Sequence, residues 1–257
     1  MDLTKLNFGV DGDSITAWQQ WSYHVYKELG FASHYNVAVG SSVWYKRHIT
    51  GEGWEVTTQN YTDPDFAGIS GGWEPTDDPL EMQMRANNCA VVHIQQYLED
   101  VKSGKAPVPD VFAFAMGTND SLECLGSPEE ALSGKALDDV DLFTEAGAVR
   151  WCIQRIMEEF PDCRVFVLTP IQAADPQHNR KNLECIKVIK AVAQAMSAQI
   201  VDCYTGCGIC EKFETEGGEG RYLRDGLHPK ENGQALQGAF AAKEIRNGLF
   251  YGECQMI

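Results

Sequence analysis

Four short blocks far apart in the chain contain the residue types that an acyl-transfer reaction requires. Ser14 lies in the segment Gly-Asp-Ser-Ile at residues 12–15, and Asp225 precedes His228 by three residues. A serine hydroxyl becomes a good nucleophile only when a base takes its proton, and an imidazole titrates near neutral pH. We therefore expect Ser14 to be the nucleophile and His228 the base. We expect Asp225 to hold the imidazole in the required tautomer and to stabilise the imidazolium.

Hydrogen-bond donors for the tetrahedral intermediate are the second requirement of this chemistry. The candidates are the backbone N–H groups of Ser14 and Gly40 and the side-chain amide of Asn119, within the segment Gly-Thr-Asn-Asp at residues 117–120. Gly40 has no Cβ, so its backbone can approach an oxyanion closely. Taken singly, such a serine is usually a helix N-cap, and a lone glycine or asparagine is usually a turn residue. The combination of the blocks is what indicates a catalytic site.

The elements that must position these blocks alternate between short apolar runs and longer helical patterns. The apolar runs predict five strands, at residues 6–10, 36–39, 111–116, 164–168 and 199–202. The helical patterns lie at residues 17–29, 79–101, 144–160, 182–198 and 229–250, with Thr144 as an N-cap and Pro229 at a first helical position. This alternation predicts crossover connections and an α/β protein with a three-layer α/β/α fold around a five-stranded parallel sheet. The blocks then meet at the carboxyl edge of the sheet, where ligands bind.

Together, the four blocks resemble those of the GDSL/SGNH hydrolase superfamily, whose name refers to one serine, one glycine, one asparagine and one histidine. The matching residues are Ser14, Gly40, Asn119 and His228, with Asp225 beside the histidine. The resemblance extends from about residue 7 to residue 248. It implies a flavodoxin-like three-layer fold and ester hydrolysis through an acyl-enzyme. It also implies that no metal or organic cofactor is needed.

The sequence departs from the family pattern in two places. Ile15 stands where the family often has leucine, which leaves the chemistry unchanged. Residues 46–78 are rich in glycine and show no periodicity, so we expect one domain over residues 1–257 with a long loop insertion at 46–78. The α/β-hydrolase alternative fits poorly, because its Gly-x-Ser-x-Gly elbow needs a glycine where Thr16 stands.

The composition restricts the partners and the compartment. The chain has 21 Lys plus Arg against 37 Asp plus Glu, a formal net charge of −16, which disfavours nucleic acid and anionic membranes as partners. Nine cysteines, an odd number, predict reduced thiols, and no signal peptide follows Met1. We therefore expect a cytoplasmic protein, or a secreted one if a signal was removed. Cys203, Cys207 and Cys210 lack the fourth ligand that a structural zinc site needs, so we expect no metal there.

Several residues are candidates for substrate binding, namely Asp13, Trp44, Trp54, Trp73 and His178. Aromatic rings beside such a site can stack on sugar faces or line an acyl pocket, and the alternative is that they pack the protein interior. Between residues 49 and 81 there are eight acidic residues and no Lys or Arg. If this segment rims the site, anionic substrates are disfavoured.

The sequence thus predicts a serine-dependent ester hydrolase that removes short acyl groups, such as acetyl, from a carbohydrate or another polar ester. One alternative is a carbohydrate-binding protein that keeps the fold without turnover. Another is an acyltransferase that passes the acyl group to an alcohol acceptor. The presence of all five site residues favours an enzyme, and the same residues serve hydrolysis and transfer. The sequence does not predict the oligomeric state.

Overall fold

Five parallel strands form the sheet of the computed structural model, which describes residues 1–17, 20–47 and 87–250. The strands are β1 (Asn7–Gly12), β2 (Ser33–Asn36), β3 (Val111–Ala115), β4 (Arg164–Leu168) and β5 (Gln199–Val201). Their order across the sheet is β2-β1-β3-β4-β5, the flavodoxin-like order of a doubly wound fold. The chain therefore reverses its direction of winding between β1 and β3, and a crevice is expected at that switch point.

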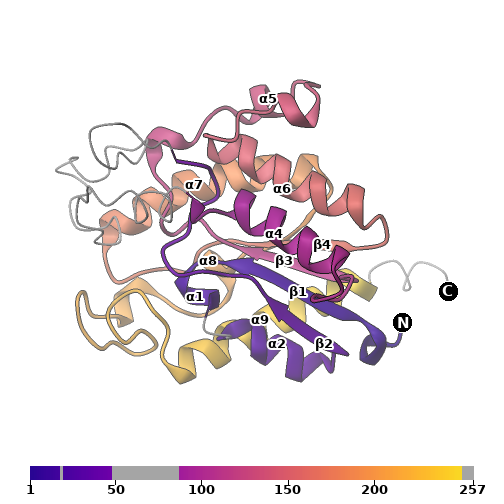
Figure 1. Ribbon diagram of the computed structural model, residues 1–257. Coiled ribbons are helices and arrows are strands. Elements are labelled where there is room, and N and C mark those ends of the chain that lie inside the picture. The colour runs from indigo at the N-terminus through magenta and orange to yellow at the C-terminus, as the bar shows by residue number, and fades with distance from the viewer. Residues whose placement is uncertain (18–19, 48–86, 251–257) are drawn as a thin grey trace.

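Helices cover both faces of the sheet and complete three layers (Figure 1). One core lies between the sheet and α4 (Ala90–Lys102), α6 (Glu145–Glu159) and α7 (Pro176–Ala195). A second core lies between the opposite face and α2 (Trp21–Leu29) and α9 (Glu231–Phe250). The shorter elements are α1 (Ser14–Ala17), α5 (Pro128–Ala131), α8 (Cys203–Gly206) and the 3-10 turns Leu3–Lys5, Leu122–Cys124, Leu137–Asp139 and Glu211–Phe213. The predicted α/β class and parallel sheet are confirmed.

The second strand begins earlier than predicted. β2 spans Ser33–Asn36, whereas the apolar run at residues 36–39 pointed to a strand there. β2 is the edge strand that pairs with β1, and all four of its residues are half-buried, so no apolar run marks it. The apolar segment after it still continues along β1, because Val37 N–H donates to Val10 O at 2.9 Å and Val39 N–H to Gly12 O at 3.2 Å.

Helix boundaries also differ from the predictions in several places. α7 begins at Pro176 and not at residue 182, with the Asp175 side chain as its N-cap, and α9 begins at Glu231, after Pro229. The predicted helix 17–29 is described as α1 and α2, and residues 18–19 between them lie outside the described residues. Thr144 is confirmed as the N-cap of α6. Residues 48–86, including Trp54, Trp73 and most of the expected 46–78 loop, lie outside the described residues.

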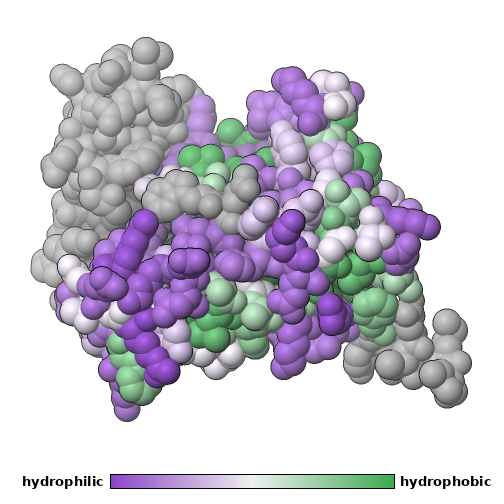
Figure 2. Space-filling model, turned by 90° about the horizontal axis from the view of Figure 1, so that it is seen from below, coloured by the Kyte–Doolittle hydropathy of each residue, from purple (hydrophilic) through white to green (hydrophobic). Residues whose placement is uncertain are grey.

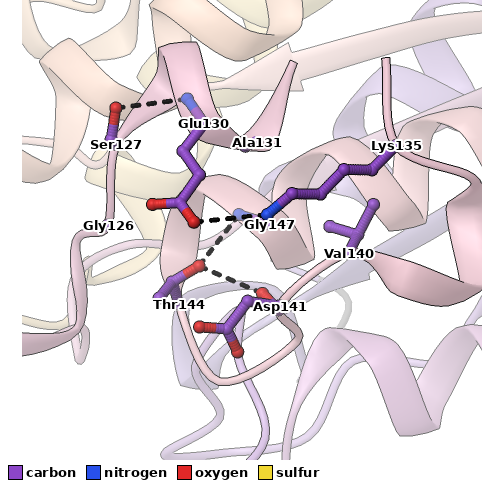
Figure 3. Close-up of a pocket in the computed structure, with 9 residues that line it drawn as sticks. All are labelled: Gly126, Ser127, Glu130, Ala131, Lys135, Val140, Asp141, Thr144 and Gly147. Atoms are coloured by element: carbon purple, nitrogen blue, oxygen red, sulfur yellow. Dashed lines mark hydrogen bonds and ion pairs between the residues drawn. The ribbon is translucent and has the colours of Figure 1, made fainter. Parts of the chain in front are cut away.

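The connection between β3 and α6 folds over the N-terminus of α6. Arg150 of α6 is buried and donates hydrogen bonds to the carbonyl oxygens of Ala131 and Lys135, which hold this connection down. A cavity of about 40 Å³ remains, crossed by the Lys135–Glu130 ion pair at 3.2 Å (Figure 3). This volume holds a few water molecules at most, so the connection is a packed cover for α6.

The face of the molecule over α2 and α9 is predominantly hydrophilic, with hydrophobic side chains in small separate groups (Figure 2). Scattered apolar side chains are normal on the surface of a globular protein. Among the described residues, no helix combines the length and the apolar character that crossing a membrane requires.

Candidate functional site

A tight turn at the end of β1 presents Ser14. The chain passes from β1 directly into α1, and Asp13 Oδ1 accepts a hydrogen bond from Ile15 N–H at 2.9 Å. Asp13 O accepts from the N–H groups of Thr16 and Ala17 at 2.9 and 2.8 Å. A Cβ at Gly12 would lie 2.4 Å from Thr16 Oγ1 and 2.7 Å from Ala115 O, so only glycine fits this turn. Ser14 therefore stands at the first residue of a helix, at the carboxyl edge of the sheet.

Ser14, His228 and Asp225 form one continuous chain of hydrogen bonds. Ser14 Oγ lies 2.8 Å from His228 Nε2, and His228 Nδ1 lies 2.8 Å from Asp225 Oδ2. The other carboxylate oxygen, Oδ1, accepts from the backbone N–H groups of His228 at 2.7 Å and Leu227 at 3.0 Å. With the proton on Nδ1, Nε2 has a lone pair that can accept the Ser14 proton. The structure thus brings together all three residues expected from the sequence to form the catalytic chain.

The charge of Asp225 follows from these contacts. Partial burial raises the pKa of Asp225, but the hydrogen bonds from the His228 backbone, the His228 ring and the Leu227 backbone outweigh that effect and hold its pKa below the usual value. Asp225 is therefore a carboxylate at neutral pH. A carboxylate beside Nδ1 stabilises an imidazolium when His228 accepts a proton.

Gly40 lies beside Ser14, and Asn119 is bonded to the segment that follows Gly40. A Cβ at Gly40 would lie 3.8 Å from Ser14 Cβ, which places this backbone against the serine. Asn88 Nδ2 donates to Gly40 O at 2.8 Å, and Asn119 Nδ2 donates to Ser42 O at 3.0 Å. Within the described part of the chain, the N–H groups of Ser14 and Gly40 have no hydrogen-bond partner. These donors are available to an oxygen that acquires negative charge near Ser14.

Three of the substrate-binding candidates are buried: Trp44 and Asp13, contrary to the prediction, and His178, which is 4% exposed and lines the cleft described below. Trp44 is 0% exposed and its ring lies 5.3 Å from the Phe114 ring, so it belongs to the core between the sheet and α4. Asp13 is 2% exposed and shapes the Ser14 turn. Burial raises the pKa of Asp13 to about 7. Large aromatic residues on a loop resemble binding residues in sequence, and only packing distinguishes the two roles.

A cleft of about 420 Å³ lies beside His228. Its lining residues are Ala173, Ala174, Asp175, His178, Glu216, Gly217, Asp225, Gly226, Leu227 and His228. His178 Nε2 lies 3.0 Å from Thr118 Oγ1. Burial and then the positive charge of Lys181 hold the pKa of His178 well below its usual value, so the ring is neutral. The cleft therefore offers carboxylates and a neutral imidazole next to His228.

Three residues that hold the site in place carry no sequence signal of their own. Asn88 supports Gly40, and Ser42 Oγ, with a single proton to donate, lies 2.7 Å from Val39 O and 2.9 Å from Gly12 O. Lys181 lies in a helical pattern, where a lysine normally faces solvent, but it is buried and donates to Thr118 O and Asp120 O on either side of Asn119. Their roles depend on contacts between distant segments, so a single sequence does not reveal them.

The cysteines after β5 are thiols. Cys203 and Cys207 are buried, and burial raises the pKa of Cys203 well above its usual value and that of Cys207 to about 11. Cys210 is half-buried. In residues 1–17, 20–47 and 87–250, no group of three or more His, Cys, Asp or Glu side chains is arranged to hold a metal ion.

Comparison with known proteins identifies sequence and structural relatives. Residues 11–236 match the profile of the GDSL-like Lipase/Acylhydrolase family. No curated protein matches the sequence. The fold is similar to that of the native M. smegmatis aryl esterase, with 14% identity, a TM-score of 0.54 and coverage of 94% of this chain and 99% of that one.

Two further solved structures share the fold. One is a mutant of Axe2, an acetyl-xylooligosaccharide esterase from Geobacillus, with 15% identity, a TM-score of 0.54 and coverage of 95% of this chain and 96% of that one. The other is the lipase/acylhydrolase from Enterococcus faecalis, with 16% identity, a TM-score of 0.51 and coverage of 94% and 96%. At these identities the likeness concerns the fold alone.

Proposed function

We propose that this chain, which belongs to the GDSL-like lipase/acylhydrolase family and is a carboxylic ester hydrolase, removes short acyl groups such as acetyl from a carbohydrate or another polar alcohol. The observation that carries the proposal is the hydrogen-bond chain from Asp225 through His228 to Ser14, with both ring nitrogens at 2.8 Å from their partners. It joins an acid, a base and a nucleophile in the arrangement that acyl transfer uses.

In the first half of the reaction, His228 Nε2 takes the proton of Ser14 Oγ as this oxygen attacks the ester carbonyl carbon. The carbonyl oxygen becomes an oxyanion, which accepts hydrogen bonds from the N–H groups of Ser14 and Gly40 and from Asn119 Nδ2. His228 then gives its proton to the alcohol oxygen, the carbon–oxygen bond breaks and the alcohol leaves. The acyl group remains on Ser14.

In the second half, a water molecule takes the place of the alcohol. His228 removes a proton from the water, and the resulting hydroxide attacks the acyl carbon. The second tetrahedral intermediate uses the same donors, and its collapse returns the proton from His228 to Ser14 Oγ. The carboxylic acid is released, and the enzyme is regenerated.

The cleft beside His228 supports a polar alcohol as the leaving group. Because His228 delivers the proton to the leaving oxygen, the alcohol must lie on the side of this ring, where the cleft is. Asp175, Glu216 and His178 in its wall can bond hydroxyl groups, and the carboxylates repel anions. The fold relative named as an acetyl-xylooligosaccharide esterase is consistent with an acetylated sugar.

A substrate panel tests the proposal. The purified chain is incubated with acetylated xylooligosaccharides, an acetylated monosaccharide and p-nitrophenyl esters from acetate to laurate, and released acid is quantified. We expect kcat/KM to fall with acyl length and acetylated sugars to be turned over. Preference for long acyl chains would overturn the substrate class. Product analysis with an added alcohol distinguishes hydrolysis from transfer, and sugar binding without any turnover would overturn the enzymatic proposal.

A further inference from the structure

A buried lysine lies directly behind the turn that carries Asn119. Lys181, in α7, is 2% exposed, and its Nζ donates to Thr118 O at 2.6 Å and to Asp120 O at 2.9 Å. These two carbonyl groups belong to the residues on either side of Asn119. The ammonium group therefore ties together both ends of the short segment from which the Asn119 side chain projects.

Polar and acidic groups surround Lys181 in the protein interior. Burial lowers the pKa of Lys181, and Cys185, Asp120, Glu145 and Asp13 act in the opposite direction. A buried cation without partners is strongly unfavourable, so carbonyl oxygens and carboxyl groups must compensate it. Lys181 meets this requirement with its two carbonyl acceptors and with the Asp120 carboxyl group of the Asn119 turn, whose pKa burial raises to about 6, so that it is largely ionised at neutral pH.

Other contacts fix the same turn from both sides. On the α7 side, His178 Nε2 lies 3.0 Å from Thr118 Oγ1. On the opposite side, Asp120 Oδ1 accepts from Trp44 N–H at 3.1 Å, and Asn119 Nδ2 donates to Ser42 O at 3.0 Å. Residues 118–120 are thus held between α7 and the segment that follows Gly40. Lys181 is the member of this set that binds the backbone on both sides of Asn119.

We propose that Lys181 is a positioning residue for the oxyanion donor Asn119: by binding the carbonyl groups of Thr118 and Asp120, it holds the Asn119 amide toward the oxygen that becomes negative during catalysis. The inference rests on the proposed function. Lys181 acts through Asn119 and does not touch the substrate. Its loss affects transition-state stabilisation, so kcat falls while KM changes little.

The test compares Lys181→Met, Asn119→Ala and the double variant on p-nitrophenyl acetate. Methionine keeps the length and the apolar stem but cannot donate a hydrogen bond. We expect Lys181→Met to lower kcat by about 10- to 100-fold with KM nearly unchanged, since small displacements of a catalytic group have effects of this size. Since Lys181 acts through Asn119, the double variant should be no slower than Asn119→Ala.

Lys190→Met is the matched control. Lys190 lies on the same helix and pairs with Asp202 Oδ2 at 2.6 Å, away from the Asn119 turn. Its variant should retain kcat within about twofold. If Lys181→Met folds poorly, Lys181→Gln keeps one donor and should give an intermediate loss of kcat. The inference would be overturned if Lys181→Met folds and keeps its kcat. It would also be overturned if Lys181→Met lowers kcat by the same factor in the Asn119→Ala background as in the unmodified chain.

A second readout does not depend on turnover. The Asn119 side-chain amide signals in a ¹⁵N-correlated NMR spectrum are identified by their absence in Asn119→Ala. We expect these signals to shift or broaden in Lys181→Met and to stay unchanged in Lys190→Met. Unchanged signals in Lys181→Met would contradict the positioning role. Absence of ester hydrolysis in the unmodified chain would instead contradict the proposed function, so the two failures are distinguishable.

Discussion

Asp225 accepts three hydrogen bonds from Leu227 and His228, and its two carboxylate oxygens bind different donors. Oδ1 accepts the backbone N–H groups of Leu227 and His228, and Oδ2 accepts from His228 Nδ1. The two backbone N–H groups orient the carboxylate independently of the imidazole. This division makes the effect of an amide at position 225 predictable, because the backbone donors require an oxygen where Oδ1 stands.

Asp225→Asn is therefore expected to lower kcat/KM about 10³- to 10⁴-fold at neutral pH. The asparagine oxygen stays with the two N–H groups, and the NH₂ group faces Nδ1 and forces the proton to Nε2. His228 then cannot accept the Ser14 proton. Steady-state kinetics on p-nitrophenyl acetate measures the effect. Activity within tenfold of the unmodified chain would show that Asp225 does not set the tautomer.

The pKa of Asp13 gives a prediction for stability against pH. Burial, followed by the charges of Asp120 and Asp11, raises the pKa of Asp13 to about 7, while Ile15 N–H and Lys181 act in the opposite direction. The folded chain therefore keeps a proton between about pH 4 and pH 7 that the unfolded chain has lost. Stability falls as pH rises through this window and is constant for this group above it.

Asp13→Asn should remove this contribution. The asparagine oxygen can still accept a hydrogen bond from Ile15 N–H. Between pH 4 and pH 8, the free energy of unfolding should fall less in the variant than in the unmodified chain, by up to about 4 kcal/mol. Urea unfolding at several pH values measures the difference. Parallel stability curves for the two proteins would mean that Asp13 does not titrate in this window.

Among the elements, the turn from β1 to α1 carries Gly12, two residues before Ser14, and the segment after β2 carries Gly40 beside Ser14. The space around them differs. A Cβ at Gly12 collides with the Ala115 carbonyl oxygen of the adjacent strand, and a Cβ at Gly40 finds ordinary contact at 3.8 Å from Ser14 Cβ. The first glycine is thus required by folding, and the second leaves the space beside Ser14 open.

We expect Gly12→Ala to lower the free energy of unfolding by about 1–3 kcal/mol or to prevent folding, since the colliding atom is backbone. For Gly40→Ala, the free energy of unfolding should stay within about 0.5 kcal/mol of that of the unmodified chain. This variant should still lose esterase activity, because its methyl group lies beside Ser14. Urea unfolding and esterase assays on both variants measure this. Equal stability losses in the two variants would contradict the distinction.

The elements also show where prediction from sequence ends. The continuous apolar run at residues 111–116 marked β3 because a central strand is buried on both faces. The position of β2 was not predicted correctly, because an edge strand needs no such apolar run. The start of α7 did have a local signal, the N-cap Asp175 followed by Pro176. Asn88 and Lys181 act through contacts between segments far apart in the chain, and no local pattern records those contacts.

For the whole molecule, strand order and charge act together on the site. The order β2-β1-β3-β4-β5 makes β1 and β3 neighbours, with Gly12 opposite Ala115, so the Ser14 and Asn119 blocks meet at one edge. The segment before α9 brings His228 to the same place. The chain has a net charge of −16, and three of its acidic residues, Asp175, Glu216 and Asp225, line the cleft.

This charge should discriminate among substrates. We expect kcat/KM for an acetylated uronic acid to be several-fold below that for the neutral acetylated sugar, with a gap that narrows as salt is added. The double variant Asp175→Asn/Glu216→Gln should reduce this difference in kcat/KM at low salt. Asparagine at position 175 preserves the N-cap of α7. Competition assays at two ionic strengths measure the gap. A gap unaffected by both salt and the substitutions would show that the rim charges do not select the substrate.

We propose that Ser14 carries the acyl group during turnover. The direct measurement is mass spectrometry of peptides after rapid acid quenching of the chain with p-nitrophenyl acetate. We predict one acetyl group on the peptide that contains Ser14, its absence in Ser14→Ala, and loss of turnover in that variant. Turnover that persists in Ser14→Ala, or an acetyl group carried by another residue during turnover, would contradict the account.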